Sequence, residues 1–282
     1  RTQSVILNKK ISYDSCRILR QTATFQDNDA TNCYDRILMP VSEICLRRLG
    51  MQGDAVKFQT KILKMMTHFI LTNKGVSEES WQYSQEFKIF GSGQGTGWSP
   101  MTWNSTNDVI SICLKENQDK MTFSSPTGKI TSARSNDSFV DDTAIGLTAK
   151  PLESPEGITS RMNGLANKYD KYLNLSGGRL AVHKCLWYFL GYKRTGDKIY
   201  PVTIKESPHL QVDITEAFSG KKVRIKRMDP DEAHKTLGVW LAVDGNSKKE
   251  VEYLQGKVNK WAMMTSALVL WTNQGSYHIT RY

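Results

Sequence analysis

Two adjacent carboxylates, Asp141 and Asp142, stand between two short segments that have the composition of β-strands. Residues 138–140 lead into the pair and residues 143–147 lead out of it, so the pattern predicts a β-hairpin with the acidic pair at its turn. Apolar flanks hold the two carboxylates together, and a divalent cation relieves their mutual repulsion. Oxygen ligands of this kind suit Mg²⁺ or Mn²⁺. For the pair taken alone, a surface turn is the alternative, because Asp favours turns.

A third carboxylate, Asp29, ends a short strand predicted over residues 24–29, six residues before Asp35. Phosphoryl transfer by two metal ions needs ions roughly 3.5–4 Å apart, which stabilise the attacking and the leaving oxygen. We therefore expect Asp29 to meet the acidic pair. Because metal–oxygen distances are roughly 2 Å, Asp29 must lie within about 10 Å of that turn.

A glycine-rich run, residues 91–97, precedes a helix predicted over residues 99–113. The run fails both common phosphate-binding patterns, because Thr96 and Trp98 stand where glycine is needed and no Gly-Lys-Ser/Thr follows. The glycines allow the backbone to approach a flat or charged ligand, and Gln94 can both donate and accept hydrogen bonds. A plain flexible loop is the alternative.

The chain carries a formal net charge of +10 and has a pI near 9.3, which favours a polyanionic partner. That partner is nucleic acid or an acidic membrane surface, and charge alone does not choose between them. Basic residues concentrate at 221–227, where alternation with apolar residues predicts a strand with one cationic face or a solvated edge strand. No run approaches the roughly 18 apolar residues of a membrane span, so no membrane segment is predicted.

The five cysteines include no Cys-x-x-Cys pair and lie in or beside apolar segments, which is typical of buried free thiols. This pattern favours a reducing, intracellular compartment. His183 and Cys185 lack a second pair of ligands, so no zinc site is predicted. The chain starts with an arginine and stops after an apolar stretch, and we interpret it as a piece of a longer open reading frame.

The order of the predicted elements favours an α+β fold rather than a doubly wound parallel sheet. At 282 residues the chain is long enough for one large or two modest domains. Apolar spacing and capping signals predict helices over residues 9–23, 37–49, 58–70, 99–113, 158–175 and 251–261. Besides the hairpin, β-branched and aromatic runs predict strands near residues 24–29, 81–89, 185–192, 199–204, 221–227 and 237–243.

Several short motifs, read in order, resemble the successive palm motifs of reverse transcriptases, above all those of eukaryotic retroelement open reading frames. They are Asp-Ala-Thr-Asn-Cys-Tyr-Asp-Arg-Ile at 29–37, Gly-Ser-Gly-Gln-Gly at 91–95, Phe-Val-Asp-Asp-Thr at 139–143, Gly-Gly at 177–178, Lys-Cys-Leu-Trp-Tyr at 184–188 and Leu-Gly at 237–238. The resemblance spans residues 27–243. Any one motif is weak, but their common order and workable separations argue strongly against a mere surface turn at the acidic pair.

The resemblance implies a role for each matching residue at the reaction centre. Asp29 and Asp141 would be the principal ligands of two Mg²⁺ ions, with Asp142 beside them and Mn²⁺ as an alternative metal. Lys184 would protonate the departing pyrophosphate as a general acid. Tyr34 would stack under the incoming sugar and exclude a 2′-hydroxyl by its bulk. A surface lysine and a core aromatic residue are the alternatives for Lys184 and Tyr34.

Other matching residues would bind the substrates. Gln94 and Gly95 would line the pocket for the nucleotide and the template base. Phe139 would support the hairpin against the primer end. Leu237 and Gly238 match the hairpin that grips the primer, where a glycine lets the backbone lie against the primer strand.

The resemblance also implies a right-hand polymerase, with an antiparallel palm sheet backed by helices and a truncated thumb. The palm with partial fingers would span residues 1–245, with the fingers insertion at about 36–90, and the helical thumb would begin at 246–282. The enzyme would be an RNA-directed DNA polymerase that uses an RNA template, a DNA or RNA primer and dNTPs in the nucleus or cytoplasm, with no membrane partner. The basic residues that clamp the triphosphate have no match upstream of the first motif, and Lys9 is not assigned to that clamp.

Two rival functions stay open on the sequence alone. Another palm polymerase, such as an RNA-directed RNA polymerase, would have no use for an aromatic gate at Tyr34. A fragment that binds nucleic acid without catalysis would not need intact Asp29, Asp141 and Asp142, although the incomplete clamp and thumb favour it. The sequence specifies no oligomeric state.

Overall fold

The computed structural model describes residues 2–82, 91–93, 96–116, 119–125 and 127–272. Its centre is a sheet of five strands: β1 (Ala23–Asp29), β6 (Asn136–Phe139), β7 (Asp142–Thr148), β8 (Leu186–Leu190) and β13 (Lys226–Met228). Their order is β13-β8-β1-β7-β6, and every neighbouring pair is antiparallel except β13 with β8. With seven α-helices in the same described ranges, the sheet confirms the predicted α+β class.

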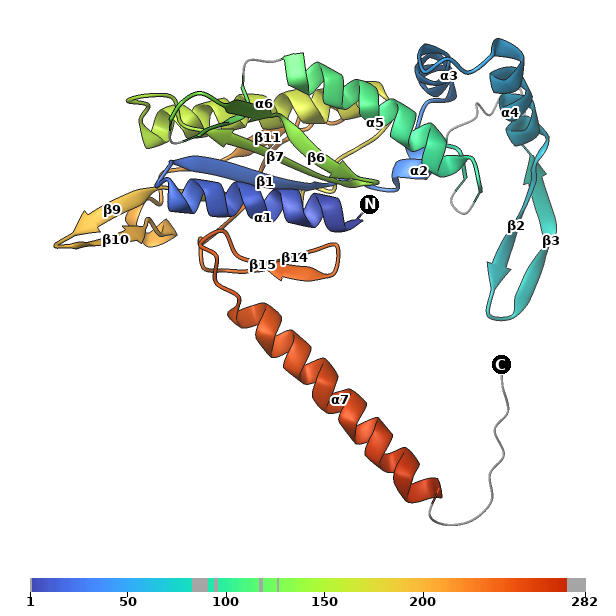
Figure 1. Ribbon diagram of the computed structural model, residues 1–282. Coiled ribbons are helices and arrows are strands. Elements are labelled where there is room, and N and C mark those ends of the chain that lie inside the picture. The colour runs from blue at the N-terminus through green and yellow to red at the C-terminus, as the bar shows by residue number, and fades with distance from the viewer. Residues whose placement is uncertain (1, 83–90, 94–95, 117–118, 126, 273–282) are drawn as a thin grey trace.

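Two helices pack on one face of the sheet, which we call the helix-backed face (Figure 1). They are α5 (Ser99–Glu116) and α6 (Pro155–Leu175). Ser154 caps α6, because its hydroxyl accepts a hydrogen bond from the Gly157 amide and a proline follows in the first turn. The core between helices and sheet is closely packed and includes the fully buried side chains of Trp103, Leu147, Tyr169 and Trp187.

Helix α1 (Thr2–Ile18) lies on the opposite face of the sheet, which we call the carboxylate face. Asp29 stands directly opposite Asp142 on this face, and residues opposite each other in an antiparallel pair share a face. Tyr13 of α1 packs there against Phe25, with ring centroids 4.7 Å apart. On the far side of α1 in Figure 1 lies the hairpin of β14 (His234–Thr236) and β15 (Val239–Leu241).

The chain after β1 forms an extension beside the sheet (Figure 1). It contains α2 (Cys33–Arg36), α3 (Met39–Arg48), α4 (Gly53–Met65) and a hairpin of β2 (Thr67–Thr72) and β3 (Gly75–Gln82). The helix predicted over 58–70 is wrong beyond Met65. The reason is the β-branched composition of β2 and the turn at Gly75, whose φ of +122° suits glycine. Of the strands predicted over 81–89, residues 83–89 lie outside the described part of the chain.

The remaining strands form small antiparallel pairs: β4 (Met121–Ser124) with β5 (Thr131–Arg134), β9 (Tyr192–Thr195) with β10 (Lys198–Pro201), and β11 (Asp213–Thr215) with β12 (Lys222–Arg224). The basic strand predicted over 221–227 is divided, because the buried Ile225 separates β12 from β13 of the main sheet. A short 3-10 turn, η1 (Ile204–Glu206), follows β10.

The last described helix, α7 (Lys248–Thr272), projects away from the sheet (Figure 1). No helix in the described ranges combines the length and the apolar character needed to cross a membrane. Four cysteines are buried free thiols, as predicted: Cys16, Cys33, Cys45 and Cys185.

Candidate active site

The residues that carry the three predicted metal-binding carboxylates lie next to one another at one edge of the carboxylate face. Asp29, the last residue of β1, is the cross-strand partner of Asp142, the first residue of β7. Directly opposed residues of an antiparallel pair have Cα atoms about 4.5–5.5 Å apart. Asp141 precedes Asp142 in the turn. Asp29 therefore lies within about 10 Å of the turn, as the metal-binding hypothesis requires.

The turn of the β6–β7 hairpin is shifted by one residue from the predicted position. Phe139 pairs with Asp142, so the two turn residues are Val140 and Asp141. Val140 has a φ of +55°, which is costly for a β-branched residue. The indole Nε1 of Trp103 on α5 donates a hydrogen bond to the Val140 carbonyl oxygen. A helix of the buried core therefore holds the backbone of this turn in place.

Neighbouring carboxylates change the acidity of Asp142. Partial burial raises its pKa to about 6, and the negative charges of Asp141, Asp29 and Asp27 raise it in the same direction. The Lys9 ammonium opposes this effect. Negative charge on Asp142 is disfavoured by its neighbours, and a bound cation would offset that repulsion. The electrostatics therefore agree with the cation-binding hypothesis.

Lys184 reaches the same site from the segment that follows α6. Its ammonium nitrogen lies 3.4 Å and 3.5 Å from the two carboxylate oxygens of Asp29. Two backbone hydrogen bonds hold the segment: Ala181 N donates to Asp29 O at 2.9 Å, and Lys184 N donates to Ala181 O at 2.7 Å. The Lys184 side chain is 57% exposed, so it is free to meet a ligand in solution.

Tyr34 lies in α2, five residues after Asp29, and is half-buried against the core. Its pKa is raised by burial, by Cys33 and by Asp141, so its phenol lies within electrostatic reach of the turn carboxylate. Its ring is neither fully buried, as a core aromatic would be, nor fully solvated.

The start of the glycine-rich run packs directly on this segment. Ser92 N donates a 2.7 Å hydrogen bond to the Tyr34 carbonyl oxygen. Gly91 has a φ of +77°, and a Cβ at that position would lie 2.5 Å from the Asp35 Cα. Only glycine permits this approach. Gln94 and Gly95, the predicted nucleotide-pocket residues, lie outside the described residues.

The turn of the β14–β15 hairpin lines a small cavity beside the carboxylates. Leu237 and Gly238 form the two-residue turn with φ values of +48° and +94°. The strand predicted over 237–243 is therefore wrong at its start. Both positive φ values are those of a type I′ hairpin turn, in which glycine is favoured. Leu237 lines a small cavity of about 40 Å³ together with Asp142.

Lys9 lies beside the site, although no sequence motif includes it. Its side chain is buried on α1, and its ammonium nitrogen lies 2.6 Å from Asp27 Oδ2 and 2.8 Å from Thr236 Oγ1. No motif includes Asp27 or Thr236 either. One signal was available, because Lys9 stands at helical spacing from the buried Tyr13 and Cys16, where an apolar residue is expected.

The donor set suits a hard divalent cation, because it consists of carboxylate oxygens on two neighbouring strands. Within the described residues, however, no three His, Cys, Asp or Glu side chains converge on a single metal position. The Asp29 carboxylate instead faces the Lys184 ammonium. The fit therefore rests on the chemistry of the donors and on the backbone positions of Asp29, Asp141 and Asp142.

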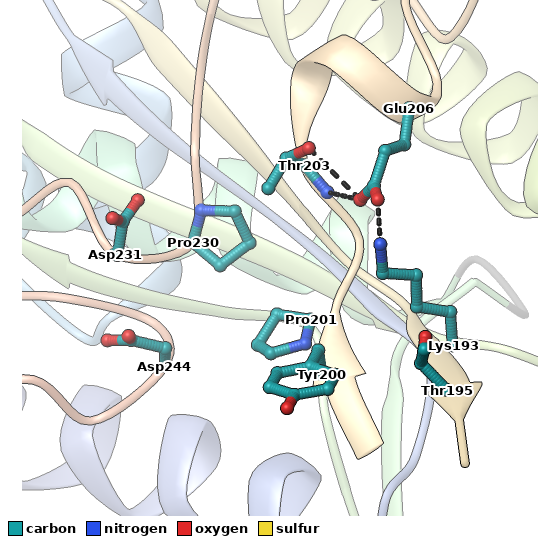
Figure 2. A pocket seen from close by; sticks show the side chains of 9 residues that line it. All are labelled: Lys193, Thr195, Tyr200, Pro201, Thr203, Glu206, Pro230, Asp231 and Asp244. Carbon is teal, nitrogen blue, oxygen red and sulfur yellow. Dashed lines mark hydrogen bonds and ion pairs between the residues drawn. The ribbon is translucent and has the colours of Figure 1, made fainter. Parts of the chain in front are cut away.

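A larger cavity, of about 490 Å³, lies elsewhere, between the β9–β10 hairpin and the loops around Pro230 and Asp244. Figure 2 shows Lys193 paired with Glu206, whose other oxygen accepts hydrogen bonds from the backbone and hydroxyl of Thr203. These polar groups satisfy one another. None of the predicted catalytic residues lines this cavity.

No protein-family model and no curated protein matches the chain. Among solved structures, the chain is similar to telomerase from Candida tropicalis, determined in complex with the TWJ fragment of telomeric RNA, with a TM-score of 0.41 and 9% sequence identity. The match covers 64% of this chain and 29% of the telomerase chain. The chain thus matches less than a third of that protein's length.

Proposed function

We propose that this chain is the palm and partial fingers of a reverse transcriptase, which adds deoxynucleotides to a primer 3′-hydroxyl while copying RNA. The observation that carries the proposal is the cross-strand pairing of Asp29 with Asp142, next to Asp141 in the turn. Lys184, beside Asp29, and Tyr34, within electrostatic reach of Asp141, lie at the same edge and support the proposal.

The architecture supports a right-hand polymerase with its palm and partial fingers in residues 1–245. The sheet is backed by α5 and α6 on one face and exposes its carboxylates at the edge of the other. The extension from α2 to β3 corresponds to the fingers insertion at about 36–90, and α7 corresponds to the start of the thumb at 246–282. A basic chain of this kind would bind RNA template and primer largely through phosphates, so affinity should fall steeply with salt.

Asp29, Asp141 and Asp142 would hold two Mg²⁺ ions, with Mn²⁺ as an alternative. When bound, such ions stabilise the negative charge on the attacking and leaving oxygens. In the reaction, the primer 3′-hydroxyl releases its proton to solvent and its oxygen forms a bond to the α-phosphorus of the dNTP, while the bond from that phosphorus to the pyrophosphate oxygen breaks. The carboxylates orient these groups, and no covalent intermediate with the chain is needed.

Lys184 would supply the proton that the departing pyrophosphate takes up. Its ammonium stands beside Asp29 without being buried, so it can turn from the carboxylate to a phosphate oxygen. General acids act from hydrogen-bonding distance, and this residue reaches the reaction edge from a segment bonded to the Asp29 backbone.

Tyr34 would lie under the incoming sugar and exclude ribonucleotides by bulk. Gln94 and Gly95, just beyond the Gly91–Gly93 segment that packs on Tyr34, would line the nucleotide and template-base pocket. Phe139, at the end of β6 opposite Asp142, would support the primer end. The Leu237–Gly238 turn would lie against the primer backbone.

The test is Mg²⁺-dependent primer extension on poly(rA)/oligo(dT). Asp141→Asn and Asp142→Asn should each lower the extension rate at least about 1,000-fold, because the loss of a metal ligand removes several kcal/mol of transition-state stabilisation. Filter binding of the same duplex should stay within about threefold of the wild type. Asp197→Asn is the matched control, because its side chain is fully exposed in the β9–β10 turn.

Each rival function predicts a different result in the same experiment. A chain that only binds nucleic acid would retain the duplex on the filter and extend no primer. An RNA-directed RNA polymerase would extend with NTPs in preference to dNTPs. Extension by Asp142→Asn at the wild-type rate would contradict the assignment of the carboxylates.

A further inference from the structure

We propose that Lys9 and Thr236 are positioning residues that fix the tip of the β14–β15 hairpin relative to the carboxylates. The inference rests on the proposed function, because it gives the hairpin tip its role at the primer terminus. It assigns a task to helix α1, which the polymerase motifs do not include.

The geometry centres on one buried ammonium. Lys9 is 4% exposed, yet its nitrogen is bonded both to the sheet and to the hairpin, at 2.6 Å from Asp27 Oδ2 and 2.8 Å from Thr236 Oγ1. A buried ammonium must be paired, so these two contacts hold its position firmly. One side chain of α1 thus joins two elements that are far apart in the sequence.

The two ends of this connection are both close to the proposed chemistry. Asp27 stands on the same strand and the same face as Asp29, two residues away, which is about 6.6–6.8 Å along the strand. Thr236 immediately precedes the Leu237–Gly238 turn. The strand that carries Asp29 therefore also sets the position of the hairpin tip, through a path of two hydrogen bonds.

Other contacts hold the hairpin away from its tip. Trp240 N donates to Glu250 Oε2 at 2.8 Å, and Asp244 N donates to the Pro230 carbonyl oxygen at 2.9 Å. Lys235 Nζ reaches the Tyr253 hydroxyl on α7 at 3.4 Å. These contacts fix the base of the hairpin to α7 and to the loop before β14, whereas the Thr236–Lys9 bond fixes its tip to the sheet.

Thr236→Val is the informative substitution. Removal of the Lys9 ammonium would leave the Asp27 carboxylate buried and unpaired, and the chain could then fail to fold for that reason alone. Valine has nearly the shape of threonine and leaves the Lys9–Asp27 pair in place, so it removes the hairpin contact alone. Thr236→Ser retains the hydroxyl, and Thr215→Val is the matched control at an exposed position of β11.

Steady-state primer extension by the full chain should separate the two substrates. Thr236→Val should raise the KM for primer–template about tenfold, as expected for the loss of one hydrogen bond to a charged group. The KM for dNTP should remain unchanged, and the midpoint of thermal unfolding should stay within about 2 °C of the wild type. Thr236→Ser should restore the primer–template KM, and Thr215→Val should leave it unchanged.

Hydrogen exchange on the same proteins gives a readout that does not need activity. In Thr236→Val the amides of β14 and β15 should exchange faster, while those of α1 and β1 keep their protection. Unchanged exchange in the hairpin would overturn the inference, even if the wild type extends primers as proposed. Equal rises in both KM values together with a lower unfolding midpoint would also overturn it, because they indicate general destabilisation. A wild type that extends no primer would refute the proposed polymerase function and with it the role at the primer, and the exchange data would still decide whether Thr236 anchors the hairpin.

Discussion

The two faces of the central sheet accommodate polar side chains in opposite ways. On the helix-backed face, β1 contributes Thr24, Gln26 and Asn28, all buried. Gln26 Nε2 donates to Asn28 Oδ1 at 2.6 Å, and Asn28 Nδ2 donates to the Thr143 carbonyl oxygen at 3.2 Å, so neutral amides bond along the sheet. On the carboxylate face, the carboxylates of the same strand need a positively charged partner instead.

This difference distinguishes polar side chains that bond within the fold from charged side chains that could bind a ligand. The two buried amides bond to fixed neighbours within the sheet, although the side-chain oxygen of Gln26 has no hydrogen-bond partner among the described residues. Asp27 is matched by the Lys9 ammonium, whereas Asp142 is raised in pKa by the carboxylates around it. Around Asp142 the negative charges of Asp141, Asp29 and Asp27 outweigh the opposing effect of Lys9, and under the proposed function this is where a divalent ion would bind.

The largest effect on stability is expected on the helix-backed face. Leu147→Ala removes a fully buried side chain from the core between β7 and the helices, and we expect a loss of about 2–5 kcal/mol in the free energy of unfolding. Urea denaturation followed by circular dichroism measures this loss. Leu71→Ala is the control, because Leu71 is 78% exposed on β2 and should change stability by less than about 0.5 kcal/mol. Equal losses of stability in both variants would show that the core on the helix-backed face contributes no more than an exposed position.

On the carboxylate face, a substitution should raise the free energy of unfolding rather than lower it. The folded state raises the pKa of Asp142 to about 6 from the ordinary value of 3.8, so folding favours its protonated form. The stability that protonation contributes is present below about pH 4 and is lost as pH rises through about 6. At pH 7.5 in EDTA, Asp142→Asn should therefore be more stable than the wild type by about 1–2 kcal/mol, after allowance for solvent screening.

The pH dependence supplies the control for that prediction. Denaturation at pH 4 should show a difference of less than about 1 kcal/mol between Asp142→Asn and the wild type, because the folded Asp142 is then protonated and only its unfolded form is partly ionised. A stabilisation that persists unchanged at pH 4 would point to packing rather than to charge.

The smallest effect is expected at Tyr34, which is half-buried against the core. Tyr34→Ala removes the proposed steric gate, and discrimination between dNTPs and NTPs should relax by about tenfold. Competing single-nucleotide extension measures the ratio of kcat/KM for the two substrates. Tyr200→Ala is a control, because this tyrosine lies in β10, away from the carboxylates. Unaltered discrimination in Tyr34→Ala would make Tyr34 a packing residue.

Local patterns predicted several elements well. The β6–β7 hairpin, α5 and α6 follow directly from alternation, capping and apolar spacing, and each forms close to its predicted limits. Where prediction failed, a turn was decisive. The turn at Gly75 pairs residues 67–72 with β3 instead of continuing α4, and the Leu237–Gly238 turn takes the first two residues of the strand predicted over 237–243.

The orientation of β1 could not be predicted, because only its first half alternates between apolar and polar residues, and residues 26–29 are polar on both faces. Lys9 was overlooked for a related reason. A lysine on a helix is ordinarily a solvated residue, and its burial became explicable only through Asp27 and Thr236.

By itself, the sequence determined which side chains could perform chemistry, because the acidic pair, the glycine-rich run and the flanking strand patterns depend only on neighbouring residues. The tertiary structure decided which of these side chains meet. Strand order places Asp29 opposite Asp142, and the packing of α1 selects Asp27 rather than Asp29 as the partner of Lys9. Such pairings depend on the register of strands distant in the chain, and register is fixed by the burial of the whole sheet rather than by any local motif.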